Sequence, residues 1–326
     1  MNSRFARAGW KEDRRLVTIN AETELYALFG SPVGHSLSPE MQTAAFRERG
    51  RNAVYLAFDV KSERLKDAVS AIRALGIRGV NVTIPFKEAI IPHLDALDES
   101  ARLYGAVNTI VVRDGLLVGH NTDGAGYIRS LEELFLIDWP KQRVVLLGTG
   151  GAMRAVAIAL AQKGVRSITL LNRTEERAQA LAVELSRFDV EIDVERWANR
   201  RHVLDDKTLV VNGTPLGMIP RTDESPLPKE ALHPGLIVSD LVYNPFKTRL
   251  LMDAENVGAR VHPGIGMLVY QGALAYELWT GEKAPVPVMY QVARSNLVHL
   301  KDAGRKDAEH RIHATMSEAR QKEPER

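Results

Sequence analysis

The sequence predicts an α/β protein of two units, the first built on a mixed sheet and the second on a doubly wound parallel sheet. Three observations lead to this fold class. The chain has 326 residues, which at roughly 100–200 residues per domain suits about two domains. From Leu25 onward, short β-rich runs alternate with longer amphipathic segments, as in sheets covered by helices. The run 143–148 is apolar almost throughout, which is typical of a strand buried on both faces.

Composition narrows the functional classes. Hydrophobic residues make up 45% and charged residues 26%, and 43 basic against 41 acidic residues leave a net charge of +2. This balance argues against a nucleic acid as the main partner. The absence of cysteine excludes disulfides, thiolate nucleophiles, Fe–S clusters and cysteine-based zinc sites. No stretch approaches the roughly 18 consecutive apolar residues of a membrane helix, so we expect no membrane association and a cytoplasmic location.

In the first unit, Ser38, Pro39 and Gly50 are typical of the N-cap, the first turn and the C-cap of a helix. Asp114-Gly115 predicts the turn of a hairpin. Pro85 ends one strand and opens the next element. The expected elements are strands at 25–30, 53–60 and 77–84, helices at 38–50 and 62–76, a hairpin at 106–120 and a helix after residue 121.

The second unit begins near Arg143. Its expected strands are 143–148, 167–173, 208–214 and 235–245, with helices at 149–164 and 174–188. A long apolar helix at 264–281 is expected to cross back to the first unit. The predicted organisation is an N-terminal arm (1–24), a first domain (25–122, completed by 267–303), a second domain (123–266) and a polar tail (304–326).

A glycine-rich loop joins the strand at 143–148 to the following helix. It consists of Gly148, Thr149, Gly150, Gly151 and Ala152. Glycines at such a junction let the backbone approach a pyrophosphate, which the N–H groups of the helix start can hold. The loop therefore predicts a dinucleotide site; the alternative is that the glycines only permit close packing.

The end of the next strand indicates which dinucleotide binds. NAD sites carry an acidic residue roughly 20 residues past the first glycine, whereas this chain has Asn172, Arg173 and Thr174 there and Arg177 one turn later. Guanidinium groups suit a phosphate, so NADP is favoured over NAD. Glu175 argues the other way, and both arginines could instead only solvate a helix start.

Several polar residues outside this loop are candidates for chemistry. Lys87 falls in the first turn of a short helix, where the helix dipole disfavours a cation, so it is either solvated or held for a task. Asp123 precedes a helix and could simply cap it, as could Ser38 beside Ser36. Asn108 lies in an apolar run, where a buried amide needs partners. Metal-like histidine spacing occurs only at His310 and His313 in the polar tail, so no metal is expected.

Seven motifs stand in one order along the chain: SPVGHSLSP, NVTIPFK, GAVNTI, NTDG, GTGGA, NRTEER and GIGMLVYQGA. Together they closely resemble the shikimate dehydrogenase family, over roughly residues 25–281. The resemblance implies NADPH-dependent reduction of 3-dehydroshikimate to shikimate in aromatic biosynthesis. It also implies an N-terminal substrate domain and a Rossmann-like NADP domain, with the site in the cleft between them.

The resemblance also assigns residues. It implies Lys87 and Asp123 as the catalytic pair, with Lys87 as general acid and base. The substrate would be bound by Lys87 and Asp123 together with Ser36, Ser38, Thr83, Asn108, Tyr243 and Gln271. The cofactor would be bound by the glycine loop and the NRTEER segment, with Leu241, Gly264 and Glu99 as less specific contacts.

The sequence departs from the family pattern at NGTPLGM (212–218), which keeps Asn212, Thr214 and Gly217. The tail is longer than the family core needs and could form a homodimer interface. Two alternatives stay open: an NAD-using quinate/shikimate dehydrogenase, for which Glu175 would argue, and a non-catalytic NADP-binding sensor.

Overall fold

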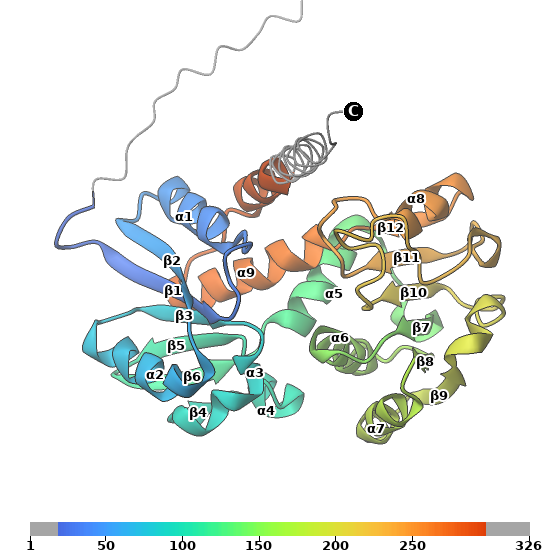
Figure 1. Cartoon of the computed structure of the whole chain (residues 1–326), viewed down its shortest axis with the longest axis horizontal. Coiled ribbons are helices and arrows are strands. Elements are labelled where there is room, and N and C mark those ends of the chain that lie inside the picture. Colours follow the sequence, from blue (N-terminus) through green and yellow to red (C-terminus); the bar gives the residue numbers. More distant parts are fainter. Residues whose placement is uncertain (1–18, 298–326) are drawn as a thin grey trace, which may run out of the picture.

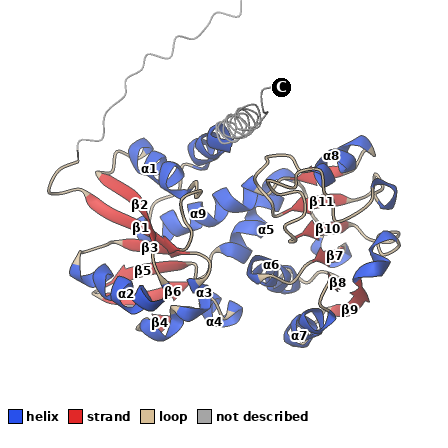
Figure 2. Cartoon of the chain, in the orientation of Figure 1, coloured by secondary structure: helices blue, strands red, loops and turns tan. Residues whose placement is uncertain are grey.

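The computed structural model describes residues 19–297 of the chain. Most of the N-terminal arm and the tail from residue 298, including His310 and His313, lie outside the described residues. Two six-stranded sheets stand side by side, and two helices run between them (Figures 1 and 2). None of the helices in the range 19–297 is long and apolar enough to cross a membrane.

The first sheet is mixed and has the order β2-β1-β3-β5-β6-β4. Strands β1, β2 and β3 are parallel, whereas β5 is antiparallel to both β3 and β6. The predicted hairpin turn is confirmed, because Asp114 and Gly115 both have positive φ. The elements are β1 (Glu24–Gly30), α1 (Ser38–Glu48), β2 (Ala53–Asp59), α2 (Leu65–Ala74), β3 (Gly79–Val82), α3 (Phe86–Ala89), β4 (Ala96–Leu97), α4 (Glu99–Tyr104), β5 (Thr109–Arg113) and β6 (Leu116–His120).

The second sheet is entirely parallel and has the order β12-β11-β10-β7-β8-β9, as predicted for a doubly wound unit. The strand order reverses at β7, which is where such folds bind ligands. Its elements are β7 (Arg143–Leu147), α6 (Gly151–Gln162), β8 (Ser167–Asn172), α7 (Glu175–Leu185), β9 (Glu191–Arg196), β10 (Leu209–Asn212), β11 (Ile237–Asp240), α8 (Arg249–Asn256) and β12 (Arg260–His262). Short 3₁₀ turns occupy Ser62–Arg64, Ile91–His93, Trp139–Lys141, Trp197–Arg201 and Lys229–Ala231.

Helices α5 (Asp123–Leu134) and α9 (Ile265–Thr280) join the two units and pack against each other (Figure 1). Helix α9 also packs against α1 and β5, and the Trp279 indole N–H donates to the Ile110 carbonyl at 3.0 Å. The prediction that this apolar helix returns to the first unit is therefore confirmed. Since α5 and α9 each carry predicted site residues, their packing positions those residues.

Several local predictions were wrong. Ser38 is not the N-cap of α1: Leu37 holds that position, and the Ser36 hydroxyl accepts from the Ser38 backbone N–H at 3.2 Å. The expected helix at 62–76 begins with a 3₁₀ turn at Ser62–Arg64, and α2 itself spans only Leu65–Ala74. Strand β9 was missed because it is an edge strand whose residues alternate between charged and half-buried apolar side chains.

Candidate active site

A cleft lies between the two units and receives residues from both. Its volume is about 310 Å³, within the range of small-molecule sites. From the first unit the lining comprises Leu28, Pro32, Val33, His35, Ser36, Ser38, Asn81, Val82, Thr83, Lys87 and Asn108; the junction helices and the second unit add Asp123, Ala152, Leu241, Tyr243, Gly264, Met267, Leu268 and Gln271. All eight residues expected to contact the substrate line this cleft.

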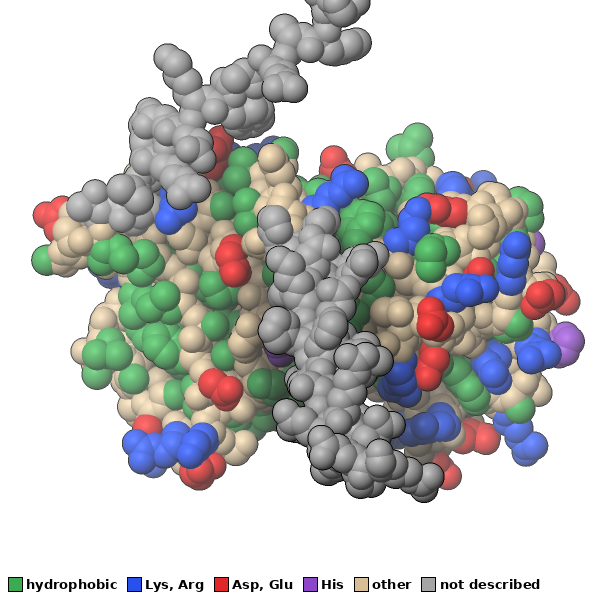
Figure 3. Space-filling model, turned by 45° about the horizontal axis from the view of Figure 1, so that its top comes forward, with side chains coloured by type: hydrophobic (Ala, Val, Ile, Leu, Met, Phe, Trp, Pro, Cys, Tyr) green, Lys and Arg blue, Asp and Glu red, His purple; other side chains and the backbone are tan. Residues whose placement is uncertain are grey.

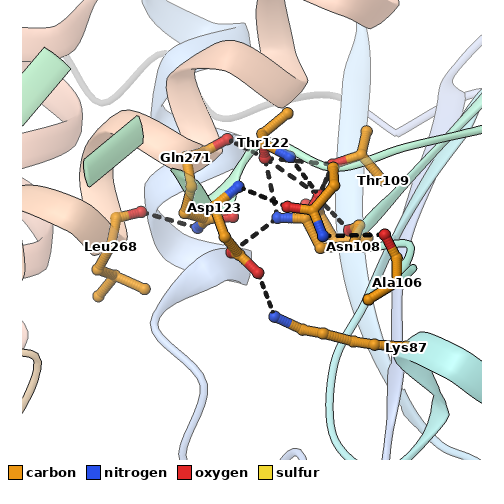
Figure 4. Close-up of polar contacts among 10 residues, drawn as sticks. Lys87, Ala106, Asn108, Thr109, Thr122, Asp123, Leu268 and Gln271 are labelled. Atoms are coloured by element: carbon orange, nitrogen blue, oxygen red, sulfur yellow. Dashed lines mark hydrogen bonds and ion pairs between the residues drawn. The ribbon is translucent and has the colours of Figure 1, made fainter. Parts of the chain in front are cut away.

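Lys87 and Asp123 form an ion pair at the cleft wall (Figure 4). The Lys87 Nζ donates to the Asp123 Oδ2 at 2.6 Å. The Asp123 side chain is 8% exposed and that of Lys87 is 25% exposed. Lys87 lies in α3, and Asp123 is the first residue of α5. This arrangement places an ammonium within the cleft and a buried carboxylate behind it.

Asn108 fixes the other oxygen of this carboxylate. Its Nδ2 donates to the Asp123 Oδ1 at 2.8 Å and to the Thr122 hydroxyl at 2.9 Å, and its Oδ1 accepts from the Thr122 backbone N–H at 2.9 Å. The buried amide of Asn108 thus has partners on both of its ends, as a buried amide requires. With Asn108 on one oxygen and Lys87 on the other, the orientation of the carboxylate is set.

The Asp123 side chain does not cap α5, which was the alternative to a role in the cleft. The Asn121 side-chain oxygen accepts from the Asp123 backbone N–H at 3.0 Å, and no side chain caps α5 from the Thr122 position. The Asp123 carboxylate makes its hydrogen bonds to Lys87 and Asn108. It is therefore directed at the cleft rather than at the start of its own helix.

The remaining cleft side chains come from four segments. Ser36 and Ser38 lie in the loop and first turn after β1, and Thr83 follows β3. Tyr243 is half-buried, and burial raises the pKa of its hydroxyl. The Gln271 side-chain amide donates to the Leu268 carbonyl at 2.8 Å, which holds it on the cleft side of α9. The cleft thus presents hydroxyl and amide groups that can form hydrogen bonds with a small polar ligand.

The glycine loop follows β7 at the reversal of strand order. Gly148 has φ +93°, and an added Cβ there would lie 3.3 Å from the Gly213 backbone. A Cβ on Gly150 or Gly151 would meet nothing within 4 Å, and α6 begins at Gly151. Open space before a helix start is what a pyrophosphate needs, so the loop fits a dinucleotide.

The other predicted cofactor residues lie in three places. Arg173, Thr174 and Arg177 are exposed around the end of β8 and the start of α7, and the Asn172 amide donates to the Thr174 carbonyl at 2.7 Å. Ala152, Leu241 and Gly264 line the cleft itself. Glu99 is exposed in the first turn of α4 and does not line the cleft.

A buried aspartate supports the strand ends beside Leu241. Asp240 accepts from the Thr248 hydroxyl at 2.6 Å and from the Asn212 amide at 2.9 Å, and burial raises its pKa to about 6. Asn212 in turn accepts from the Thr214 hydroxyl at 2.7 Å. These contacts explain why the NGTPLGM segment retains Asn212 and Thr214 where it otherwise departs from the family pattern, because the two residues hold the turn after β10 to the sheet.

Sequence reasoning missed several cleft residues, among them His35, Asn81, Met267 and Leu268. Asn81 is buried in β3, where it accepts from the Tyr55 hydroxyl at 2.8 Å and donates to the Thr109 hydroxyl at 3.1 Å. The argument that singled out Asn108, an amide within an apolar strand, would have found Asn81 as well. Within residues 19–297, no group of three or more acidic or histidine side chains could hold a metal ion.

Comparison with known proteins gives matches along most of the chain. Residues 28–110 match the shikimate dehydrogenase substrate binding domain, residues 131–215 the shikimate / quinate 5-dehydrogenase family and residues 264–294 the shikimate 5'-dehydrogenase C-terminal domain. The shikimate dehydrogenase (NADP(+)) of Moorella thermoacetica is 52% identical over 86% of this chain and 95% of its own length.

Solved structures agree in fold. The shikimate 5-dehydrogenase of Thermus thermophilus, in complex with NADP(H) and shikimate, is 38% identical with a TM-score of 0.76, over 83% of this chain and 99% of its own. The quinate dehydrogenase of Corynebacterium glutamicum, in complex with NAD, is 33% identical with a TM-score of 0.77, over 84% of this chain and 99% of its own.

Proposed function

The chain belongs to the shikimate dehydrogenase family, and from this premise we propose that it reduces 3-dehydroshikimate reversibly to shikimate with NADPH, using Lys87 and Asp123 as its catalytic pair. The observation that carries the assignment of the pair is their contact in the cleft, where the ammonium lies 2.6 Å from a carboxylate that is 8% exposed. All eight residues expected to contact the substrate line the same cleft. A non-catalytic binding protein would have no need of this arrangement.

The pair can supply what reduction of a ketone requires. NADPH, when bound, supplies the hydride. As the carbonyl carbon gains it, the carbon–oxygen double bond becomes single and negative charge builds on the oxygen. The Lys87 ammonium stabilises this charge and transfers its proton to the oxygen, completing the alcohol. Because Lys87 is 25% exposed, it regains a proton from solvent.

Asp123 and Asn108 act on Lys87 and on the substrate together. The buried carboxylate keeps the ammonium in place, and its position is held by the Asn108 amide at 2.8 Å. During turnover, the Asp123 carboxylate also accepts a hydrogen bond from a hydroxyl of the substrate ring. Ser36 and Ser38, which line the same cleft, bind the ring carboxylate, and Tyr243, Gln271 and Thr83 complete the contacts.

The residues that would hold the cofactor lie in the second unit. The glycine loop would bind the pyrophosphate through backbone N–H groups, and Arg173 and Arg177 would pair with the 2′-phosphate. Leu241 and Gly264, which line the cleft, would contact the nicotinamide. The open space before Gly150 and Gly151 and the exposure of both guanidiniums support this placement.

We also propose that the chain divides as its sequence predicts. This division assigns residues 25–122 with 267–303 to the substrate domain and residues 123–266 to the cofactor domain; residues 298–303 lie outside the described range. The support is that β1–β6 share one sheet and β7–β12 another, and that α9 packs against α1. The cytoplasmic location and the possible homodimer stay predictions. On the face drawn in Figure 3, acidic and basic side chains are interspersed, which suits a small-molecule enzyme better than a polyanion-binding protein.

Initial rates with shikimate or quinate and with NADP⁺ or NAD⁺ test the reaction. We expect shikimate with NADP⁺ to be the preferred combination; preference for quinate with NAD⁺ would refute the assignment. The Lys87→Met variant tests the mechanism, and we expect kcat to fall by about 10²–10⁴-fold with NADPH affinity retained. Lys163→Met is the matched control, since Lys163 pairs with Glu132 at the same 2.6 Å outside the cleft. Near-normal turnover by Lys87→Met would disprove the proton-transfer role.

A further inference from the structure

Arg154 bridges the two units at a point outside the cleft. It lies in the first turn of α6, next to the glycine loop, and its Nη1 donates to the carbonyl of Tyr104, the last residue of α4. Helices α4 and α6 come from different units and lie against each other (Figure 1). The last carbonyls of a helix have no partner within it, so a guanidinium from the other unit satisfies one of them.

Two further residues build this contact into a cluster. The Glu184 carboxylate on α7 accepts from the Arg154 Nε at 2.7 Å and from its Nη2 at 2.7 Å. Arg187, also near Glu184, donates to the Leu103 carbonyl at 2.9 Å. A bidentate pair fixes the plane of a guanidinium, and Arg154 thus directs its remaining nitrogen at α4. We name Arg154, Glu184 and Arg187 the arginine clamp.

Gly105 lets the clamp approach the backbone. It follows α4 with φ +58°, and an added Cβ would lie 3.1 and 3.3 Å from the two terminal nitrogens of Arg154. The guanidinium therefore lies directly over the backbone of Gly105. A larger residue there would be strained by the positive φ and would require the Arg154 guanidinium to shift.

Each side of the contact between Arg154 and α4 is bonded to one of the two ligand sites, the glycine loop on one side and the Lys87–Asp123 pair on the other. The Arg154 backbone N–H donates to the Gly150 carbonyl at 2.8 Å, so the arginine is tied to the pyrophosphate loop. On the other side, Val107 lies two residues after Gly105, and its N–H donates to the Lys87 carbonyl at 2.7 Å. The next residue, Asn108, donates to the Asp123 carboxylate. One guanidinium therefore connects the glycine loop to segment 105–108, which contacts both Lys87 and Asp123.

We propose that Arg154 is a positioning residue that couples the two ligand sites, by holding the glycine loop at a set distance from Lys87 and Asp123. This inference rests on the proposed function. On this inference, a ligand in either site would stabilise the clamped arrangement that the structure shows, so the second ligand would bind to a site already assembled. By linkage, the coupling is reciprocal: each ligand raises affinity for the other by the same factor.

The test measures binding rather than turnover alone. NADPH and shikimate do not react with each other, so the affinity for NADPH is titrated by its fluorescence with and without saturating shikimate. In the wild-type protein we expect shikimate to tighten NADPH binding by about fivefold or more. In Arg154→Met we expect this ratio to fall close to one, with NADPH affinity in the absence of shikimate nearly retained. In the same variant kcat should fall by about tenfold or more, because the reacting groups are no longer held in place.

Two further variants keep the test decisive. Glu184→Gln preserves the shape of the clamp and weakens the hold on Arg154, and it should lower the ratio to an intermediate value. Arg143→Met is the matched control, because Arg143 pairs with Asp206 at 2.6 Å in the same unit but away from α4; its ratio should equal that of wild type.

The outcomes separate this inference from the proposed function. Absence of shikimate oxidation by the wild-type protein would defeat the proposed function. An active wild-type enzyme with no coupling between the ligands would overturn the inference. So would Arg154→Met or Glu184→Gln variants that are less stable to urea but keep the wild-type ratio, because the clamp would then serve stability only.

Discussion

Replacing Gly126 by alanine tests whether the crossing of α5 and α9 sets the geometry of the site. Gly126 lies one turn after Asp123 on α5, against the backbone of Gln271 on α9. A Cβ at Gly126 would lie 2.5 Å from the Gln271 backbone nitrogen and 2.7 Å from its Cα. Since non-bonded carbons settle at about 3.5–4.0 Å, the helices would have to separate by about 1 Å.

The expected loss of stability follows from two opposing effects. Alanine in place of glycine within a helix gains about 1 kcal/mol. Overpacking costs about 1–3 kcal/mol, and the upper end applies because the obstructing atoms are backbone. We therefore expect Gly126→Ala to lower the free energy of unfolding by about 2 kcal/mol. The kinetic loss should be larger, about 10²-fold in kcat/KM, because Asp123 and Gln271 move apart with their helices.

Gly272→Ala is the matched control on the facing helix. A Cβ there would meet the Met41 Cε at 2.5 Å, which is the mobile end of a flexible side chain, and nothing else closer than 3.3 Å. Met41 can move aside, so the helix gain should roughly cancel the cost. Urea unfolding followed by circular dichroism, together with kcat/KM for shikimate, compares the two. If Gly126→Ala is as stable and as active as Gly272→Ala, the reasoning from the crossing is wrong.

Two other predictions concern charge. His262 is fully buried, and desolvation lowers its pKa to about 3, so below pH 6.5 the unfolded chain takes up a proton that the folded protein does not. The free energy of unfolding should thus decrease as the pH is lowered, by about 2 kcal/mol at pH 5. His262→Gln should remove this contribution to the pH dependence. The raised pKa of Asp240 affects the pH dependence of stability in the opposite direction, and this effect cancels when variant and wild type are compared in urea at each pH. If the free energy of unfolding has the same pH dependence in both proteins, the prediction is wrong. Arg173→Ala should raise KM for NADP⁺ by about tenfold or more and change KM for NAD⁺ little, whereas equal losses in both assays would show that this guanidinium does not meet the 2′-phosphate.

Features that depend on neighbouring residues could be predicted well. The hairpin turn at Asp114-Gly115, the buried parallel strands and the glycine loop before α6 all follow from local conformational preference and hydrophobic pattern. Errors arose where local rules compete. Ser38 is a residue type typical of an N-cap, yet α1 begins one residue earlier than predicted, with Leu37 as its N-cap. The Ser38 backbone N–H donates to the Ser36 hydroxyl.

The alternation of strands and helices, the loop for a pyrophosphate and the kinds of side chain available for chemistry could all be predicted from the sequence, because each is encoded within a few consecutive residues. Which side chains meet depends on the folded chain as a whole. Lys87 and Asp123 are 36 positions apart, and Arg154 reaches a carbonyl 50 positions away. Such meetings depend on sheet register and on how closely helices such as α5 and α9 approach, and no short stretch of sequence carries that information.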